Sequence, residues 1–127
     1  MNSVPAQGME TLRLLDRAGF ESALVGGAVR DLLLGRTPGD IDIATEASFS
    51  ALAALFPGGK SVGPEGKPVF LVPCGERRCE ITSFCGGSLE TDLARRDFTV
   101  NALALRSTGE LVGTRRSKLD IELRLLR

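Results

Sequence analysis

The sequence predicts an α/β fold, in which a small mixed and mostly antiparallel sheet is backed by helices. Short segments with a helical period alternate along the chain with short apolar segments that have the period of a strand. The length of 127 residues suits one domain. No internal repeat, linker or low-complexity segment divides the sequence, so we expect a single folded unit.

The chain opens with an expected helix over residues 9–18. Leu12, Leu14, Leu15 and Ala18 are expected near one another on this helix, and Gly19 ends it in the way that a C-terminal glycine commonly does. A short buried strand, Ala23 to Val25, follows and leads directly into a pair of glycines.

Gly26 and Gly27 separate this strand from a second helix, which has Val29, Leu32 and Leu33 on one side and Gly35 at its end. A strand, two glycines and a helix start offer free N–H groups and the positive end of the helix dipole to a phosphate. Taken alone, however, such a glycine pair is more often a plain tight turn.

Two carboxylates mark the next strand. Ile41 and Ile43 alternate with Asp40 and Asp42, which is the period of a strand with one apolar and one acidic face. The two acidic residues then stand about 7 Å apart along the strand and face the same way, a spacing that suits Mg²⁺. Alone, this pattern is more often a solvated strand face; its closeness to the glycine pair favours a site.

A third helix and two strands are expected in the middle of the chain. Ser48 is a typical N-cap for a helix that ends at Leu55, before the sequence FPGG. The segments 69–72 and 79–84 have the composition of strands and are joined by the polar turn PCGERR.

The last predicted elements are a helix and a hairpin. Ser88 or Thr91 begins a short helix that runs to Arg95. Residues 101–112 then form a hairpin with its turn at residues 107–109.

Composition excludes several classes of function. Sixteen Lys and Arg balance sixteen Asp and Glu, so a local patch must hold any anionic partner. The chain has no histidine, which removes the usual zinc sites and the commonest general base, and we expect Cys74, Cys79 and Cys85 to be reduced thiols in or near strands. Lacking an apolar run near 20 residues and a signal peptide, the sequence is typical of a cytoplasmic protein with no membrane partner.

Two long motifs give a specific resemblance. LVGGAVRDLLLGRTPGDIDIAT, at residues 24–45, resembles the signature of the class II tRNA nucleotidyltransferase and bacterial poly(A) polymerase family, in the polymerase β superfamily. RRDFTVNALAL, at residues 95–105, is similar to the second signature of that family, and CEITSF, at residues 79–84, stands where the family has a third acidic strand. The resemblance implies a polymerase β-like nucleotidyltransferase fold.

The resemblance also implies roles for individual residues. Asp40 and Asp42 match the carboxylates that hold two Mg²⁺ ions, and Glu80 matches a third carboxylate that polarises the attacking 3′-hydroxyl. The residues that match nucleotide-binding positions are Gly26, Gly27 and Arg30 for the triphosphate, and Arg95, Arg96, Asp97 and Asn101 for ribose and phosphates. Asp31 and Asp97 have the alternative, structural role of pairing with the arginines next to each of them in the sequence.

The implied activity is metal-dependent transfer of a nucleoside monophosphate from an NTP, such as CTP or ATP, to the 3′-hydroxyl of an RNA, the 3′ end of a tRNA. Three departures qualify this. The flexible loop expected after Phe84 is missing, residues 113–127 keep little of the family's hinge segment, and the neck, body and tail are absent. We therefore expect residues 1–127 to be a head domain, as a fragment or an engineered minimal core with CC-adding or relaxed base choice. The alternative is a non-catalytic nucleotide-binding or interaction module with the same fold.

Overall fold

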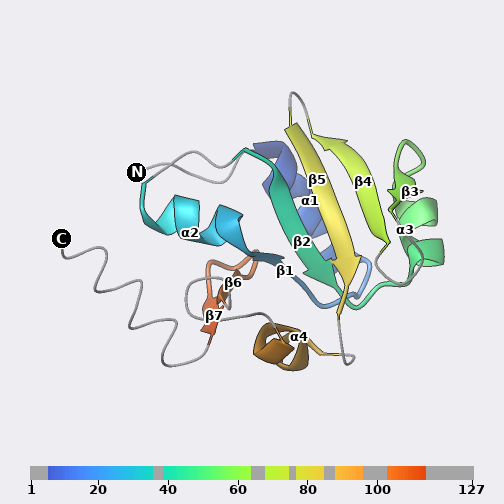
Figure 1. Ribbon diagram of the computed structural model, residues 1–127. Helices are drawn as coiled ribbons and strands as arrows, with labels where there is room; N and C mark the ends of the chain where they lie inside the picture. Colours follow the sequence, from blue (N-terminus) through green and yellow to red (C-terminus); the bar gives the residue numbers. More distant parts are fainter. Residues whose placement is uncertain are drawn as a thin grey trace.

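The computed structural model describes residues 6–35, 39–63, 68–74, 77–84, 88–95 and 103–113. In this part of the chain, helices pack against one sheet, which confirms the predicted fold class (Figure 1). The elements are α1 (Ala6–Arg17), β1 (Ser22–Val25), α2 (Gly27–Leu33), β2 (Ile41–Thr45), α3 (Phe49–Leu55), β3 (Lys60–Val62), β4 (Val69–Cys74), β5 (Arg77–Ser83), α4 (Leu89–Arg95), β6 (Leu103–Leu105) and β7 (Leu111–Gly113). None of the described helices is long and apolar enough to cross a membrane.

The described strands form one sheet in the order β3-β4-β5-β2-β1-β6-β7. Strands β2 and β5 run parallel, and the other neighbouring pairs of described strands are antiparallel. The mixed, mostly antiparallel sheet is thus as predicted. A parallel pair needs a long crossover connection, and the segment that holds α3, β3 and β4 supplies it.

Each face of the sheet has its own apolar core. The larger core joins the isoleucines of β2 to leucines of α1 and to residues of α2 and α3, and α1 lies behind β2 and β5 in Figure 1. The smaller core joins α4 to the opposite face through Ala23, Val25, Ala44, Phe84, Leu89, Leu93 and Ala104. Since side chains alternate along a strand, the face of β2 that carries Ala44 also carries Asp42.

A group of polar side chains, buried at Ser22 and Thr45, connects the ends of three strands. The hydroxyl oxygens of Ser22 in β1 and Thr45 in β2 lie 2.8 Å apart, and Thr45 is fully buried. The backbone N–H of Ala47 donates to the Thr45 hydroxyl at 3.2 Å, and the hydroxyl of Ser83 in β5 donates to the Ala47 carbonyl at 3.0 Å. These hydrogen bonds stabilise the register in which Thr45 lies beside Ser83 and Asp42 beside Glu80.

Serine side chains begin two of the helices, as the sequence predicts. Ser48 precedes α3 and its hydroxyl accepts a hydrogen bond from the N–H of Ala51 at 3.2 Å. Ser88 precedes α4 in the same way and accepts from the N–H of Thr91 at 3.1 Å, so Ser88, and not Thr91, begins that helix. The first helix begins at Ala6, earlier than the expected Met9.

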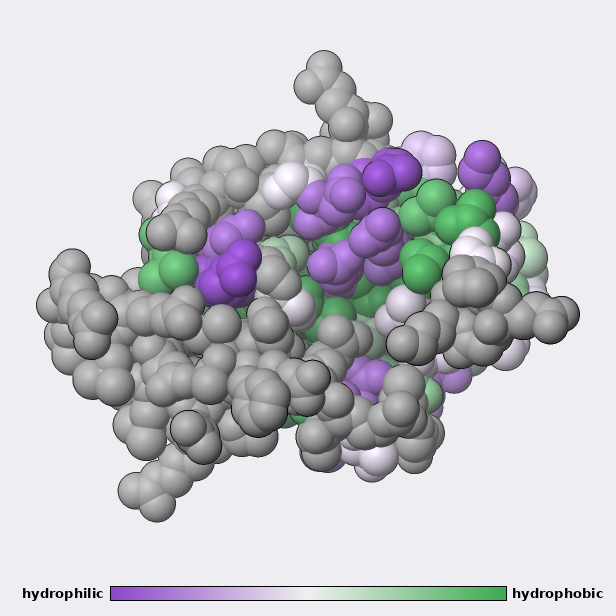
Figure 2. All heavy atoms as spheres, viewed as in Figure 1, coloured by the Kyte–Doolittle hydropathy of each residue, from purple (hydrophilic) through white to green (hydrophobic). Residues whose placement is uncertain are grey.

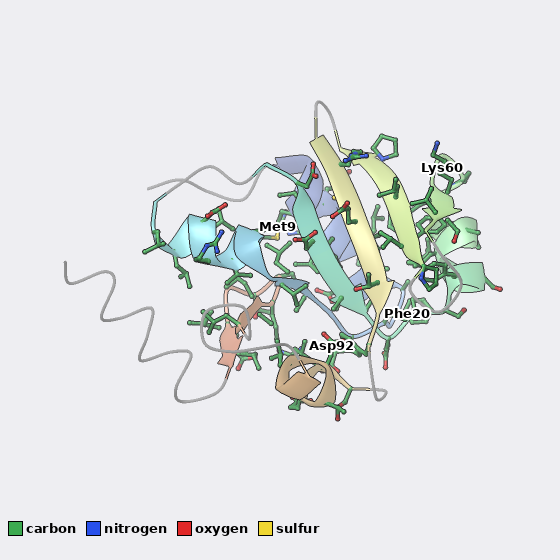
Figure 3. The ribbon with its side chains drawn as sticks, viewed as in Figure 1. Met9, Phe20, Lys60 and Asp92 are labelled. Carbon is green, nitrogen blue, oxygen red and sulfur yellow. The ribbon has the colours of Figure 1, made fainter. Side chains whose placement is uncertain are left out.

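Strand β3 is an element that the sequence analysis missed. Its residues Lys60–Val62 are all exposed and pair with β4 at the edge of the sheet, so they show no apolar period (Figure 3, Lys60). The adjacent Gly59 packs closely against Phe70. A Cβ atom at Gly59 would lie only 2.4 Å from the Cε1 atom of that ring. Phe70 also packs edge-on against Phe49, with ring centroids 5.9 Å apart.

The expectation for the cysteines is only partly met. Cys74 and Cys79 lie in strands β4 and β5, as expected, and Cys85 lies outside the described residues. Cys79 is fully buried and disulfide-bonded. The expectation of a reduced thiol is therefore wrong at Cys79.

Candidate active site

The parallel pairing of β2 with β5 brings the predicted carboxylates together. Asp42 is the register partner of Glu80, and neighbouring strands lie about 4.8 Å apart. Ile41 and Ile43 are fully buried in the core on the opposite face, which directs the half-buried Asp42 to the face that α1 does not cover. The alternation predicted from the sequence thus exists, and the register adds Glu80 to the acidic face.

This face is polar over the two strands. Figure 2 shows hydrophilic side chains gathered over β2 and β5, and a second hydrophilic group over α2. In Figure 3, oxygen-bearing side chains stand along β2 and β5 on the side toward the viewer, with α1 behind. The face opposite the larger core is therefore available for charged ligands.

The glycine turn meets this acidic face. Gly26 precedes α2 with φ +71° and ψ −149°, and its carbonyl accepts hydrogen bonds from the N–H groups of Val29 at 3.1 Å and Arg30 at 3.4 Å. A Cβ atom at Gly26 would lie 3.4 Å from Oδ2 of Asp42. The backbone at the start of α2 therefore lies close to this carboxylate, and the positive φ is the feature that favours glycine there. Gly27 is the first residue of α2 itself.

Arg30 stands one turn into α2 with a donor that has no partner. Its Nε atom is buried and makes no hydrogen bond within the described part of the chain, and its Nη2 atom lies 3.5 Å from Oδ1 of Asp31. A buried donor without an acceptor costs free energy, so an anionic oxygen at this point would be stabilised. The contact with Asp31 also agrees with the alternative that Asp31 pairs with an arginine.

Arg78 joins the acidic face, although the sequence analysis did not single it out. Its Nη2 atom lies 3.6 Å from Oδ2 of Asp40, and the two side chains are 60% and 46% exposed. The signal was present in the sequence, since Arg78 precedes Glu80 by the same two positions that separate Asp40 from Asp42. A parallel register aligns these two pairs.

The donor set fits Mg²⁺ in chemistry, because carboxylate oxygens are the ligands that this ion prefers. In the described part of the chain, however, no three side chains of the metal-binding types come close enough together to hold one ion. Asp40 is paired with Arg78 in this arrangement, while Asp42 and Glu80 are neighbours. Asp40 and Asp42, with Glu80 beside them, are the residues that would hold the ion once Asp40 turns from Arg78.

Most of the second predicted group of residues lies outside the described part of the chain. Arg95 ends α4, but only its backbone is described, and Arg96, Asp97 and Asn101 fall between the described segments. The next strand, β6, begins at Leu103 and pairs with β1, the strand that leads into Gly26. The end of the second signature thus runs beside the glycine turn.

Comparison with known proteins gives consistent matches. The family described as poly A polymerase head domain matches residues 22–87 and 74–127. The CC-adding tRNA nucleotidyltransferase of Shouchella clausii is 44% identical over 98% of this chain and 33% of its own length. The CCA-adding enzyme of Geobacillus thermodenitrificans is 41% identical over 95% of this chain and 34% of its own. The chain therefore spans about a third of the length of these relatives.

Solved structures are also similar. The crystal structure of the Bacillus stearothermophilus CCA-adding enzyme in complex with CTP matches with a TM-score of 0.84 and 36% identity, over 96% of this chain and 32% of that one. A tRNA nucleotidyltransferase complexed with a primer tRNA and an incoming ATP analog matches with a TM-score of 0.67 and 27% identity, over 87% of this chain and 36% of that one.

Proposed function

Since this chain belongs to the poly(A) polymerase head-domain family, as its two signatures predict, we propose that it catalyses transfer of a nucleoside monophosphate from an NTP to the 3′-hydroxyl of a tRNA. Residues 1–127 would form the catalytic head domain. The names of the relatives support addition at a tRNA 3′ end, and the complexes with CTP, an ATP analog and primer tRNA support the choice of partners. A cytoplasmic setting agrees with this role.

One observation carries the proposal. Asp42 lies beside Glu80 in the register of β2 and β5. The Oδ2 atom of Asp42 also lies close to the backbone of Gly26, since a Cβ atom built on Gly26 would be 3.4 Å from it. The carboxylates of Asp42 and Glu80 therefore lie next to the candidate phosphate-binding turn at Gly26. A solvated acidic strand face needs no glycine turn against it.

The chemistry needs few protein groups. Bound Mg²⁺ would supply the positive charge that activates the 3′-hydroxyl and neutralises the departing pyrophosphate. Asp40 and Asp42 bind and orient that charge, and Glu80 polarises the attacking hydroxyl. The oxygen–phosphorus bond to the α-phosphorus forms as the bond to pyrophosphate breaks, and the proton of the 3′-hydroxyl is released to solvent. The N–H groups at the start of α2 and the Nε atom of Arg30 neutralise the outer phosphates.

Base choice is a separate part of the proposal. The residues named above reach phosphate, metal and ribose, and a site without hydrogen-bonding groups that face the base discriminates poorly. We therefore expect these residues alone to show little preference between CTP and ATP. Single-nucleotide extension with each of the four NTPs measures this, and a strong preference for CTP would show that base reading resides within residues 1–127.

The activity is tested with a tRNA that ends before its terminal CCA, Mg²⁺ and labelled NTP. Wild type is expected to extend the RNA, and Asp42→Asn to lose extension by at least about a hundredfold. Glu10→Gln, an exposed carboxylate of α1 behind the sheet, is the matched control and should retain activity. A tRNA with a 3′-deoxy end should not be extended. Equal extension by wild type and Asp42→Asn would contradict the assignment of the site.

A further inference from the structure

We propose that Arg78 is a positioning residue: its guanidinium holds Asp40 in the metal-free protein and must leave it when a divalent cation binds. Arg78 would thereby set the affinity of the site for the cation. This inference rests on the proposed function, because it takes Asp40 and Asp42 as the metal-binding pair.

The register places Arg78 where it can act on Asp40. Asp42 and Glu80 are direct partners in the parallel pair β2–β5, and Asp40 and Arg78 lie two positions earlier on each segment, on the same face. The distance between Nη2 and Oδ2 is 3.6 Å. On its other side, Arg78 pairs in register with Pro73 of β4, which carries no charge. Among the described residues, Asp40 is the carboxylate aligned with Arg78, and the ion pair joins these two side chains.

The ion pair between Arg78 and Asp40 is weak enough to be broken by a bound cation. Both side chains are substantially exposed, at 60% and 46%, and the 3.6 Å contact is longer than a good charge-assisted hydrogen bond. Exposed ion pairs of this kind contribute little to folding stability. A divalent cation held by Asp42 as well as Asp40 attracts the same carboxylate with twice the charge, so it displaces the guanidinium.

Competition between Arg78 and the cation for Asp40 predicts a change in metal affinity that a purely structural ion pair would not cause. Removing the positive charge should tighten metal binding, because the cation no longer competes with Arg78 or sits beside it. At low ionic strength we expect Arg78→Gln to bind Mn²⁺ about three to ten times more tightly than wild type. A residue that only supported the fold would, when removed, loosen the site and weaken binding.

The experiment measures Mn²⁺ affinity by electron paramagnetic resonance of the free ion, without nucleotide. Arg78→Lys keeps the charge and should stay close to wild type. Arg13→Gln removes one positive charge from the exposed side of α1, behind the sheet, and controls for net charge. In the Asp40→Asn background, Arg78→Gln should tighten binding less than it does with Asp40 present, because the shared carboxylate is gone and only the repulsion between Arg78 and the ion is relieved.

Two results separate the inference from the proposed function. If Asp42→Asn binds Mn²⁺ as well as wild type, the metal site itself is wrongly assigned. If Asp42→Asn loses binding but Arg78→Gln binds no more tightly than Arg13→Gln, the metal site stands and the role of Arg78 is overturned. Circular dichroism melting of each variant identifies any that fail to fold. If Arg78→Gln fails to fold, the Mn²⁺ affinities of Arg78→Lys and wild type are compared instead at higher salt, where the two should change together.

Discussion

Oδ2 of Asp42 lies 3.4 Å from the point that a Cβ atom on Gly26 would occupy. Gly26 and Asp42 belong to different elements, the turn before α2 and the strand β2, so this contact depends on the fold and not on sequence proximity. It also brings a helix start and a carboxylate, which attract ligands of opposite charge, to one point. A metal–triphosphate complex is a ligand that satisfies both.

Gly26→Ala should therefore impair both folding and binding. A φ of +71° with a ψ of −149° is a backbone conformation that essentially only glycine adopts, so it costs an alanine about 1 to 3 kcal/mol, and the added methyl group would contact Oδ2 of Asp42. Gly19→Ala is the control, since its φ is +92° and a Cβ atom there would meet no described atom within 4 Å. Urea unfolding should give similar losses for both variants, whereas Mn²⁺ and NTP titrations should weaken only for Gly26→Ala. Equal binding by the two variants would contradict the role of the turn.

Arg30→Ala should weaken binding of a triphosphate more than binding of a monophosphate. The Nε atom is buried without a partner in the described part of the chain, and under the proposed function the guanidinium would neutralise the outer phosphates, which AMP lacks. Calorimetry with ATP and AMP measures the difference, and Arg17→Ala at the exposed end of α1 is the control. If ATP and AMP lose equal affinity, Arg30 serves only as the partner of Asp31.

Gly59→Ala should destabilise the fold without touching the candidate site. The new Cβ atom would lie 2.4 Å from Cε1 of Phe70 and 2.9 Å from the carbonyl oxygen of Leu71, so either the ring or the strand must move. Overpacking of this kind costs about 1 to 3 kcal/mol. Gly58→Ala is the adjacent control, because a Cβ atom there would meet no described atom within 4 Å. The midpoints of urea unfolding should differ clearly, with Mn²⁺ affinity unchanged in the variant that remains folded.

Thr45→Val should cost stability through the loss of its buried hydroxyl. That hydroxyl is shared with Ser22 and accepts from the N–H of Ala47, and removing it leaves the Ala47 N–H unsatisfied, at about 1 to 3 kcal/mol, while the Ser22 hydroxyl keeps its hydrogen bond to the Phe20 carbonyl. A double-mutant cycle with Ser22→Ala isolates the side-chain pair. We expect a coupling of about 0.5 to 1.5 kcal/mol in urea unfolding, and strictly additive losses would show that the two hydroxyls act independently.

The sequence predicts most elements because their signals are local. Ile41 and Ile43 reveal β2 through their alternation, and Ser48 reveals the start of α3 through its cap. Strand β3 has no such signal, because all three of its residues are exposed and its pairing partner, β4, lies beyond a connecting segment. Its existence depends on an edge that only the assembled sheet provides.

The candidate site also has parts that local motifs predict and parts that depend on the assembled sheet. The carboxylates and glycines can be recognised as motifs in the sequence. The alternation of apolar and acidic residues along a strand, however, is the same whether its neighbour is parallel or antiparallel. The neighbours of Asp42 therefore follow only from the register that sets Thr45 beside Ser83. The pairing of Arg78 with Asp40 escaped notice for this reason. The disulfide at Cys79 likewise depends on spatial proximity rather than on spacing along the chain.

The position of β1 between β2 and β6 has a consequence for synthesis of the chain. Leu24 pairs with Ile43, which follows soon after it, and with Leu105, which emerges from the ribosome much later. Until then β1 presents an open edge of backbone N–H and C=O groups, and such an edge is a template for another strand. A nascent chain that has formed the acidic face but not β6 should therefore be prone to association with other chains. Sedimentation of a chain ended at Arg95 would detect this, and the pairing of β6 with β1 covers that edge.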